Sequence, residues 1–195
     1  MGKIYTELDE RLRAWIAEQQ MFFVATAPLA AQGHINLSPK GLDSFRVLSN
    51  TEVAYLDLTG SGVETIAHLR ENARMTIMFC AFAGVPRILR LYGQGRAVEP
   101  VDADWERYRD NFPEYPGTRS VIVLAIQRVT DSCGYGVPRY EFREQRRQLT
   151  DYAEKQGAEN LARYRAENNR QSIDGLPGLR AAGEKDEGER MKAKV

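Results

Sequence analysis

The chain has 195 residues, a length that one globular domain can fill without a disulfide or metal to stabilise it. Hydrophobic residues make up 43% of the chain and charged residues 28%, and 27 basic residues balance 27 acidic ones. This composition excludes a disordered or fibrous protein, and the balanced charge argues against a dedicated nucleic-acid binder, which usually carries a basic excess.

The first half of the chain predicts a helix, a series of strands and a second helix. Thr6 is the expected N-cap of the first helix, whose apolar residues recur at helical spacing. From residue 21, short runs rich in β-branched and aromatic residues are separated by Gly, Pro, Asn or Asp, a pattern typical of antiparallel strands. Ser61 and Glu64 form a capping box, which predicts that the second helix begins at Ser61 and continues to about Glu71.

The second half predicts three further strands and a polar helix. The strands are expected at residues 74–82, 86–98 and 120–129, and the helix at about 101–110. Gly93 and Gly95 indicate a bulge or a close backbone approach in the middle strand. These elements predict an α+β protein, with a small closed or half-open antiparallel barrel of six to seven strands between about residues 20 and 142.

The composition shifts after Arg143 to a charged, helical segment, which Gly157 is expected to break in two. We expect three parts: residues 1–142 form the barrel domain with its N-terminal helix, residues 143–179 a C-terminal helical arm and loop, and residues 180–195 a disordered tail.

The first candidate site is the segment Asn36-Leu37-Ser38-Pro39-Lys40-Gly41, at the end of a strand. Pro39 is expected to fix a turn there, from which Lys40 projects beside hydroxyl and amide groups, an arrangement that suits a phosphate. The alternative is a plain β-turn with a solvated lysine.

The second candidate site is the glycine-rich turn between residues 58 and 65, where a strand leads into a helix. Backbone N–H groups and the helix dipole would bind an anion there, and Thr59, Ser61 and Thr65 would add hydroxyl donors. Glu64 brings negative charge to the same helix end and counts against a phosphate. The alternative is a capped helix after a glycine turn.

The third candidate is one face of the strand at residues 86–98. Alternation places Arg90, Tyr92, Gln94 and Arg96 on the same face, which would cover a polar aromatic ligand or simply face solvent.

Other chemistries lack support in the sequence. His34, His68, Cys80 and Cys133 do not have the spacing of a zinc site, and Ser61 does not lie in a nucleophile elbow. The charged N-terminus lacks the apolar core of a signal peptide, and no apolar run is long enough for a membrane span, so we expect a cytoplasmic protein.

The chain carries four segments in a specific order: FVAT, INLSPKG, YLDLTGSGVETIAHLRENARMTIMFCAF and RLYGQGRAV. The most specific part is the helix that leads through Glu71-Asn72-Ala73-Arg74 into an apolar strand. With these segments the chain resembles, from about Met21 to Val98, the pyridoxamine 5′-phosphate oxidase-like family of FMN-binding split β-barrels.

The resemblance implies a set of cofactor-binding residues. Lys40 falls near the flavin phosphate, the backbone of Leu37 and Ser38 along the isoalloxazine ring, and Thr59 beside the cofactor. Ser61 to Thr65 matches the start of the phosphate-binding helix, but Glu64-Thr65 stands where the oxidase has an Arg-Lys pair. The C-terminal substrate-binding signature of the oxidase is not recognisable in this chain. The predicted cofactor-binding residues are Leu37, Ser38, Lys40, Thr59, Ser61, Thr65 and Arg90.

The resemblance further implies an FMN-binding oxidoreductase of unknown substrate, acting as a homodimer with flavin between the subunits. No nucleic acid, membrane or metal is expected as a partner, and no catalytic acid or base is identified. One alternative is a non-catalytic protein that binds a flavin, the deazaflavin F420 or haem, for which His34 or His68 would be the iron ligand. The other is a structural dimer whose flavin site has been lost.

Overall fold

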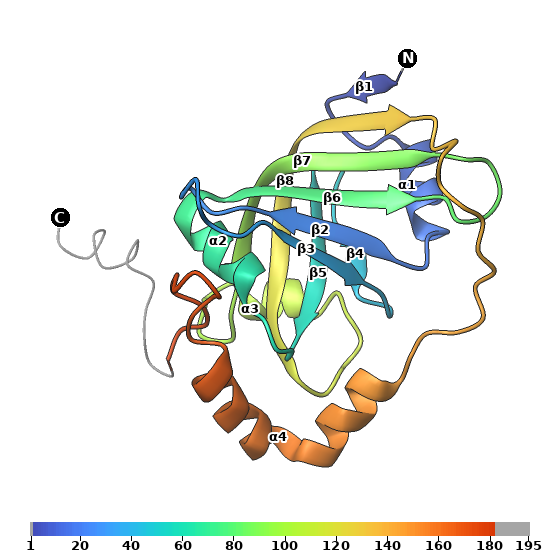
Figure 1. Ribbon diagram of the computed structural model, residues 1–195. Coiled ribbons are helices and arrows are strands. Elements are labelled where there is room, and N and C mark those ends of the chain that lie inside the picture. The colour runs from blue at the N-terminus through green and yellow to red at the C-terminus, as the bar shows by residue number, and fades with distance from the viewer. Residues whose placement is uncertain (1, 182–195) are drawn as a thin grey trace.

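The strands of the protein are β1 (Lys3–Tyr5), β2 (Phe22–Thr26), β3 (Asn36–Lys40), β4 (Phe45–Val47), β5 (Glu52–Leu58), β6 (Arg74–Cys80), β7 (Ile88–Val98) and β8 (Thr118–Ser132). The computed structural model describes residues 2–181, and in this range all eight strands join one antiparallel sheet. The sheet follows the order β3-β2-β6-β7-β8-β5-β4, with β1 added beside β8. It curls into a half-open barrel flanked by helices (Figure 1), which confirms the predicted α+β split barrel.

Alternating side chains from the strands fill the barrel interior. Four aromatic rings meet where the two ends of the sheet approach each other. The ring centroid of Phe22 lies 5.0 Å from that of Phe45 and 5.4 Å from that of Tyr55. The ring centroids of Phe45 and Phe79 are 5.1 Å apart. Such edge-to-face pairs contribute about 0.5–1.5 kcal/mol each beyond the area they bury. The aromatic cluster therefore joins the ends of the sheet from within, although no backbone ladder closes the barrel.

Strand β3 extends further than the sequence indicated. Pro39 was expected to fix a turn, but it lies within β3 opposite Phe23 of β2, and Lys40 is the last residue of the strand. The prediction was wrong because β3 stands at the edge of the sheet, where the missing N–H of a proline leaves no ladder hydrogen bond unmade.

Both predicted helix caps were also wrong. Helix α1 (Glu10–Ala17) is capped by Asp9, whose Oδ1 accepts a hydrogen bond from the Leu12 N–H at 2.7 Å, and not by Thr6. Helix α2 (Glu64–Asn72) begins three residues after Ser61, with Val63 at the N-cap and no side-chain cap. The Glu64 carboxylate folds back against Gly62, so it does not form the predicted capping box.

The predicted bulge in β7 is confirmed. The register with β8 shifts between Tyr92 and Gly93, and a Cβ at Gly93 would lie 1.9 Å from the Ala125 carbonyl oxygen. Only glycine permits this approach, which sharpens the bend of the sheet.

Helices α3 (Trp105–Arg109) and α4 (Gln148–Asn168) follow the expected positions. Gly157 interrupts α4 with φ 72° and ψ 167°, which confirms the predicted break. Helix α4 crosses below the barrel (Figure 1), and the turn at Gly117 meets its buried residues Ala153 and Leu161.

The chain end differs in part from the predicted tail. The Arg180 side chain is only 8% exposed and pairs with Glu99 at 3.2 Å, while the predicted tail from residue 182 onward lies outside the described residues. None of the described helices is both long and apolar enough to cross a bilayer.

Candidate functional site

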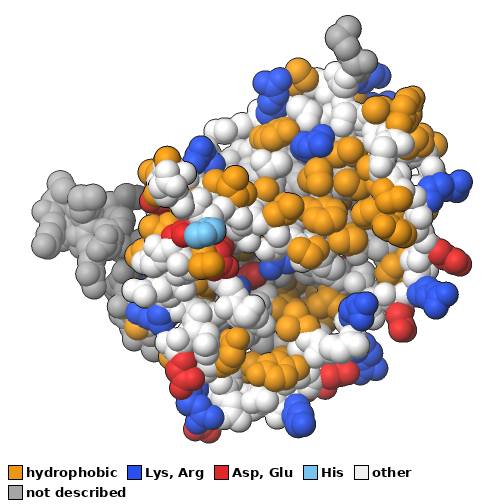
Figure 2. Space-filling view, in the orientation of Figure 1, with side chains coloured by type: hydrophobic (Ala, Val, Ile, Leu, Met, Phe, Trp, Pro, Cys, Tyr) orange, Lys and Arg blue, Asp and Glu red, His pale blue; other side chains and the backbone are white. Residues whose placement is uncertain are grey.

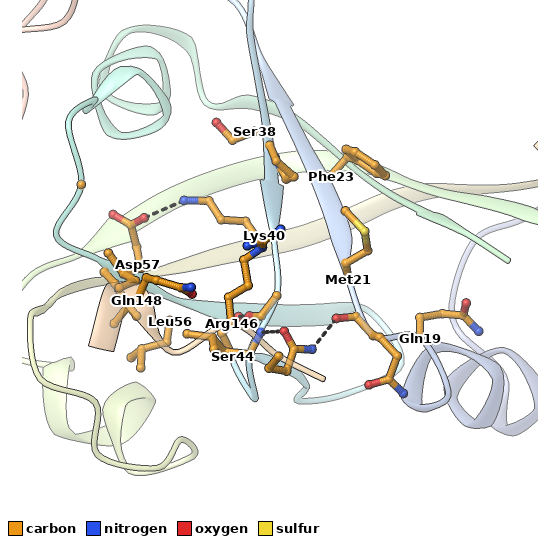
Figure 3. Close-up of a pocket in the computed structure, with 18 of the residues that line it drawn as sticks. Gln19, Met21, Phe23, Ser38, Lys40, Ser44, Leu56, Asp57, Arg146 and Gln148 are labelled. Atoms are coloured by element: carbon orange, nitrogen blue, oxygen red, sulfur yellow. Dashed lines mark hydrogen bonds and ion pairs between the residues drawn. The ribbon is translucent and has the colours of Figure 1, made fainter. Parts of the chain in front are cut away.

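A groove of about 1590 Å³ lies between the open side of the barrel and the C-terminal arm (Figure 3). One wall is formed by β3 and the turn from Leu58 to Thr65. The other is formed by the strap, which we define as residues 133–147, the segment that joins β8 to α4. Ligand pockets commonly enclose about 300–1,000 Å³, so the groove has room for a ligand of cofactor size.

Strand β3 presents an open backbone edge at the groove, because it pairs only with β2. Ser38 and Lys40 lie on one face of the strand, and both line the groove. Asn36 links β3 to the start of α2, since its Nδ2 donates to Thr65 Oγ1 at 3.0 Å and its Oδ1 accepts from Ser38 Oγ at 2.9 Å. These bonds hold two of the predicted site segments together.

The Lys40 ammonium crosses the split in the barrel and pairs with Asp57 of β5 at 3.1 Å (Figure 3). Asp57 is buried and also accepts a bond of 2.7 Å from Arg119 Nε. Burial raises the pKa of the Asp57 carboxyl, but the charges and hydrogen bonds of Arg119 and Lys40 outweigh it and hold that pKa at about 2. The group therefore stays ionised, and the cluster of these two cations and one carboxylate carries one net positive charge.

The turn before α2 is held by side chains from distant parts of the chain. Thr59 donates its hydroxyl proton to the Gly117 carbonyl at 2.8 Å and accepts a bond from Arg165 Nη1 at 3.1 Å. The Gly62 carbonyl accepts from Arg119 Nη2 at 2.8 Å. The Thr59 hydroxyl therefore has no proton left to donate to a ligand in this arrangement.

The start of α2 lines the groove at Glu64 and Thr65. Because no side chain caps this helix end, its dipole and first N–H groups favour an anion. The Glu64 carboxylate opposes this, but one of its oxygens accepts a bond of 3.3 Å from the N–H of Ile173, in the loop at residues 172–179.

The structure brings together five of the seven predicted cofactor-binding residues. The groove is lined by Ser38, Lys40, Thr59, Ser61 and Thr65. The Leu37 side chain points away and is 63% exposed, although its backbone lies in the edge strand. Arg90 does not line the groove, and its Nη1 donates to Ser132 Oγ at 3.2 Å from a strand in the middle of the sheet.

Neither of the two histidines in the chain lines the groove. His68 is fully buried and its Nδ1 lies 2.9 Å from Thr26 Oγ1, while burial lowers the pKa of its ring. His34 binds Asp174 through both its backbone N–H and its ring Nδ1, each at 2.7 Å. These contacts tie the loop at residues 172–179 to the segment before β3, so a haem ligand in the groove finds no support.

Sequence reasoning missed Asp57, Arg119, Arg165 and the strap residue Gln145. A signal existed only for Asp57, because a carboxylate inside the apolar run Tyr55-Leu56-Asp57-Leu58 requires a buried partner. The arginines and Gln145 act on residues far away in the sequence, and no local pattern marks them.

Comparison with known proteins places the chain in a family. The family model described as "Pyridoxamine 5′-phosphate oxidase" matches residues 8–133. A relative from Aspergillus flavus, "Pyridoxamine 5′-phosphate oxidase family protein ustO", is 42% identical over 208 residues, covering 97% of this chain and 82% of the relative.

Two solved structures are similar to this chain at low identity. A putative pyridoxamine 5′-phosphate oxidase from Lactobacillus delbrueckii is 19% identical, with a TM-score of 0.49 over 64% of this chain and 94% of that chain. An FAD binding protein from Mycobacterium smegmatis is 14% identical, with a TM-score of 0.42 over 66% of this chain and 97% of that chain. The family model and the fungal relative carry the assignment: the chain belongs to the pyridoxamine 5′-phosphate oxidase family.

Proposed function

We propose that the protein binds FMN in the groove and is a flavin-dependent oxidoreductase whose substrate is unknown. The observation that carries the proposal is that two features a flavin requires face the same groove. The open edge of β3 offers backbone groups to a planar heterocycle, and the uncapped start of α2 offers an anion site for a phosphate.

The residues present fit such a cofactor. Met21 and Phe23 give the groove apolar surface, and Ser38 and Lys40 give it polar groups on the adjacent strand. A bound flavin would supply the electron-transfer chemistry, while the chain binds and orients it and keeps water from it. No acid or base of the chain is assigned a catalytic role.

A local cluster of charges on the groove wall supports an anionic ligand. Lys40 and Arg119 share the single carboxylate of Asp57, so this cluster carries one excess positive charge. The ionised Asp57 also fixes the Lys40 side chain, so that its charge reaches the groove in a defined position.

The test is a titration of the purified protein with FMN, followed by quenching of flavin fluorescence and by the visible spectrum. We expect the wild type to bind FMN saturably. Lys40→Ala should bind it about tenfold more weakly, because the variant loses one charged hydrogen bond. Lys155→Ala, which removes an exposed lysine of α4, is the control and should bind as the wild type does. Saturation with F420 or haemin but not with FMN would contradict the proposal and identify another cofactor.

We also propose that the protein is a homodimer, joined through the outer face of β2, β3, β6 and β7. The strand registers place Phe23, Ala25, Leu37, Met78 and Tyr92 side by side on this face, where none is fully buried. Figure 2 shows hydrophobic side chains gathered there, beside the hollow of the groove. A patch of this kind on a soluble protein commonly marks an interface.

Arg90 lies on the same face, opposite Met78. Its predicted contact with the cofactor therefore requires a flavin bound by the other subunit.

The oligomeric state tests the interface. Sedimentation equilibrium of the wild type should give twice the chain mass, and Leu37→Asp should give a monomer. Ile4→Asp, which changes another exposed apolar residue, is the control and should remain a dimer. A wild-type monomer at micromolar concentration would contradict the interface.

A further inference from the structure

Arg165, near the C-terminal end of α4, lies in an electrostatically unusual position. Its guanidinium is half-buried and donates to Thr59 Oγ1 at 3.1 Å, and it forms no ion pair with a carboxylate of residues 2–181. A half-buried guanidinium loses part of its hydration, a cost that a counter-ion normally offsets.

A second cation increases this cost. Burial and the nearby charge of Arg119 lower the pKa of Arg165 below its ordinary value. Around the turn from Thr59 to Thr65, three cations (Lys40, Arg119, Arg165) face two carboxylates (Asp57, Glu64), an excess of one positive charge before the helix dipole is counted.

Fastening the arm to the turn does not require the charge of Arg165. Asn169, the C-cap residue directly after α4, already donates to the Gly60 carbonyl at 3.0 Å and accepts from Arg119 Nη1 at 2.8 Å. A neutral side chain at position 165 would complete the same attachment to Thr59 without the repulsion from Arg119. A cation held there against this repulsion suits a site that takes up an anion.

We propose that Arg165, which lies behind Thr59 and does not line the groove itself, supplies positive charge to the anion-binding turn, so that the C-terminal arm contributes to the site for the phosphate of a bound nucleotide. The proposal rests on the flavin site proposed above. It names a residue that replaces part of the positive charge missing at Glu64-Thr65, where the oxidase has an Arg-Lys pair. The charge comes from α4, 106 positions beyond Thr59, and not from the first turn of α2.

Arg165→Gln tests the proposal because it removes the charge and keeps an amide that can bond to Thr59. The matched control is Arg163→Gln. Arg163 is an exposed residue of the same helix, and among residues 2–181 its side chain bonds only to Asn160, three residues away. Circular dichroism verifies the fold of both variants. The probes are FMN, riboflavin (which has the same ring and no phosphate) and inorganic phosphate.

The wild type should bind FMN at least about tenfold more tightly than riboflavin. Arg165→Gln should lose about tenfold in FMN affinity and none in riboflavin affinity, and Arg163→Gln should change neither. Equal losses for the two flavins, or no loss, would overturn the proposal and leave Arg165 as a support of the turn.

Inorganic phosphate separates this inference from the flavin proposal. If the wild type binds neither flavin, the proposed function fails, but phosphate should still raise the melting temperature of the wild type and of Arg163→Gln, and not that of Arg165→Gln. The same phosphate response in all three proteins would overturn the role of Arg165.

Discussion

Two contacts close the groove, and they are built from different interactions. On the barrel side, Asp57 binds Lys40 across the split and Arg119 beside it, with its carboxylate only 2% exposed. On the arm side, the strap is attached by Gln145, whose Oε1 accepts from Leu42 N–H at 2.9 Å and whose Nε2 donates to the Gln20 carbonyl at 2.8 Å.

The two contacts differ in the free energy needed to break them, because one is buried and the other lies at the surface. Ion pairs removed from water are costly to break one partner at a time, because the remaining charge stays buried without a counter-ion. Neutral hydrogen bonds at the surface exchange with water, and each contributes about 0.5–1.5 kcal/mol. The barrel wall should therefore act as a fixed surface and the strap as a detachable one, and the predictions below test this difference.

The largest effect is expected from Asp57→Asn. The substitution keeps the size of the side chain but leaves Arg119 and Lys40 without a counter-charge, so the free energy of unfolding should fall by about 3–5 kcal/mol. Urea unfolding measures this change. Asp43→Asn, which removes the partner of the surface residue Arg46, is the control and should cost less than about 1 kcal/mol. Equal costs for the two variants would show that burial does not distinguish them.

The second effect is the pH dependence of the same carboxylate. The pKa of Asp57 is about 2 in the folded protein against an ordinary value of 3.8, so its contribution to stability is fully present above about pH 4 and is lost as pH falls through 2. The shift corresponds to about 2 kcal/mol. The stability difference between the wild type and Asp57→Asn should therefore shrink by about that amount between pH 5 and pH 2. A difference that stays constant over this range would contradict an ionised Asp57.

The barrel was largely predictable from the sequence because local patterns specify it. Alternation of apolar residues marked the long strands, and Gly93 marked the bulge. Strand β1 was missed because its three residues are mostly exposed and pair with the far end of β8, so they show no apolar alternation. The cap at Asp9 is a local pattern, an aspartate that accepts from the N–H three residues on, and choosing Thr6 overlooked it. The strand position of Pro39 depends on tertiary context that local propensity does not contain.

The site was predictable only where the chain supplies it in one segment. The residues in β3 and in the turn before α2 lie within single motifs, and five of the seven predicted line the groove. Arg119 reaches Asp57 across 62 positions, and Gln145 reaches Gln20 across 125. Such partners are chosen by the folded topology, so no spacing rule identifies them.

The smallest effect is expected from Gln145→Ala, which removes both hydrogen bonds that attach the C-terminal end of the strap. Global stability should fall by no more than about 1–2 kcal/mol, because the amides and carbonyls released can bond to water. The strap itself should detach, since its other described attachment is the Tyr140 N–H bond to the Phe82 carbonyl with the stacking of those two rings. Hydrogen exchange at the Tyr140 N–H, which bonds to the barrel, should accelerate while the exchange of β5 and β8 stays unchanged. Gln148→Ala is the matched control, because the side chain of this groove residue forms no hydrogen bond with residues 2–181, and it should leave the Tyr140 N–H protected. If Gln145→Ala also accelerates exchange in β5 and β8, the strap supports the barrel and the two contacts form one cooperative unit.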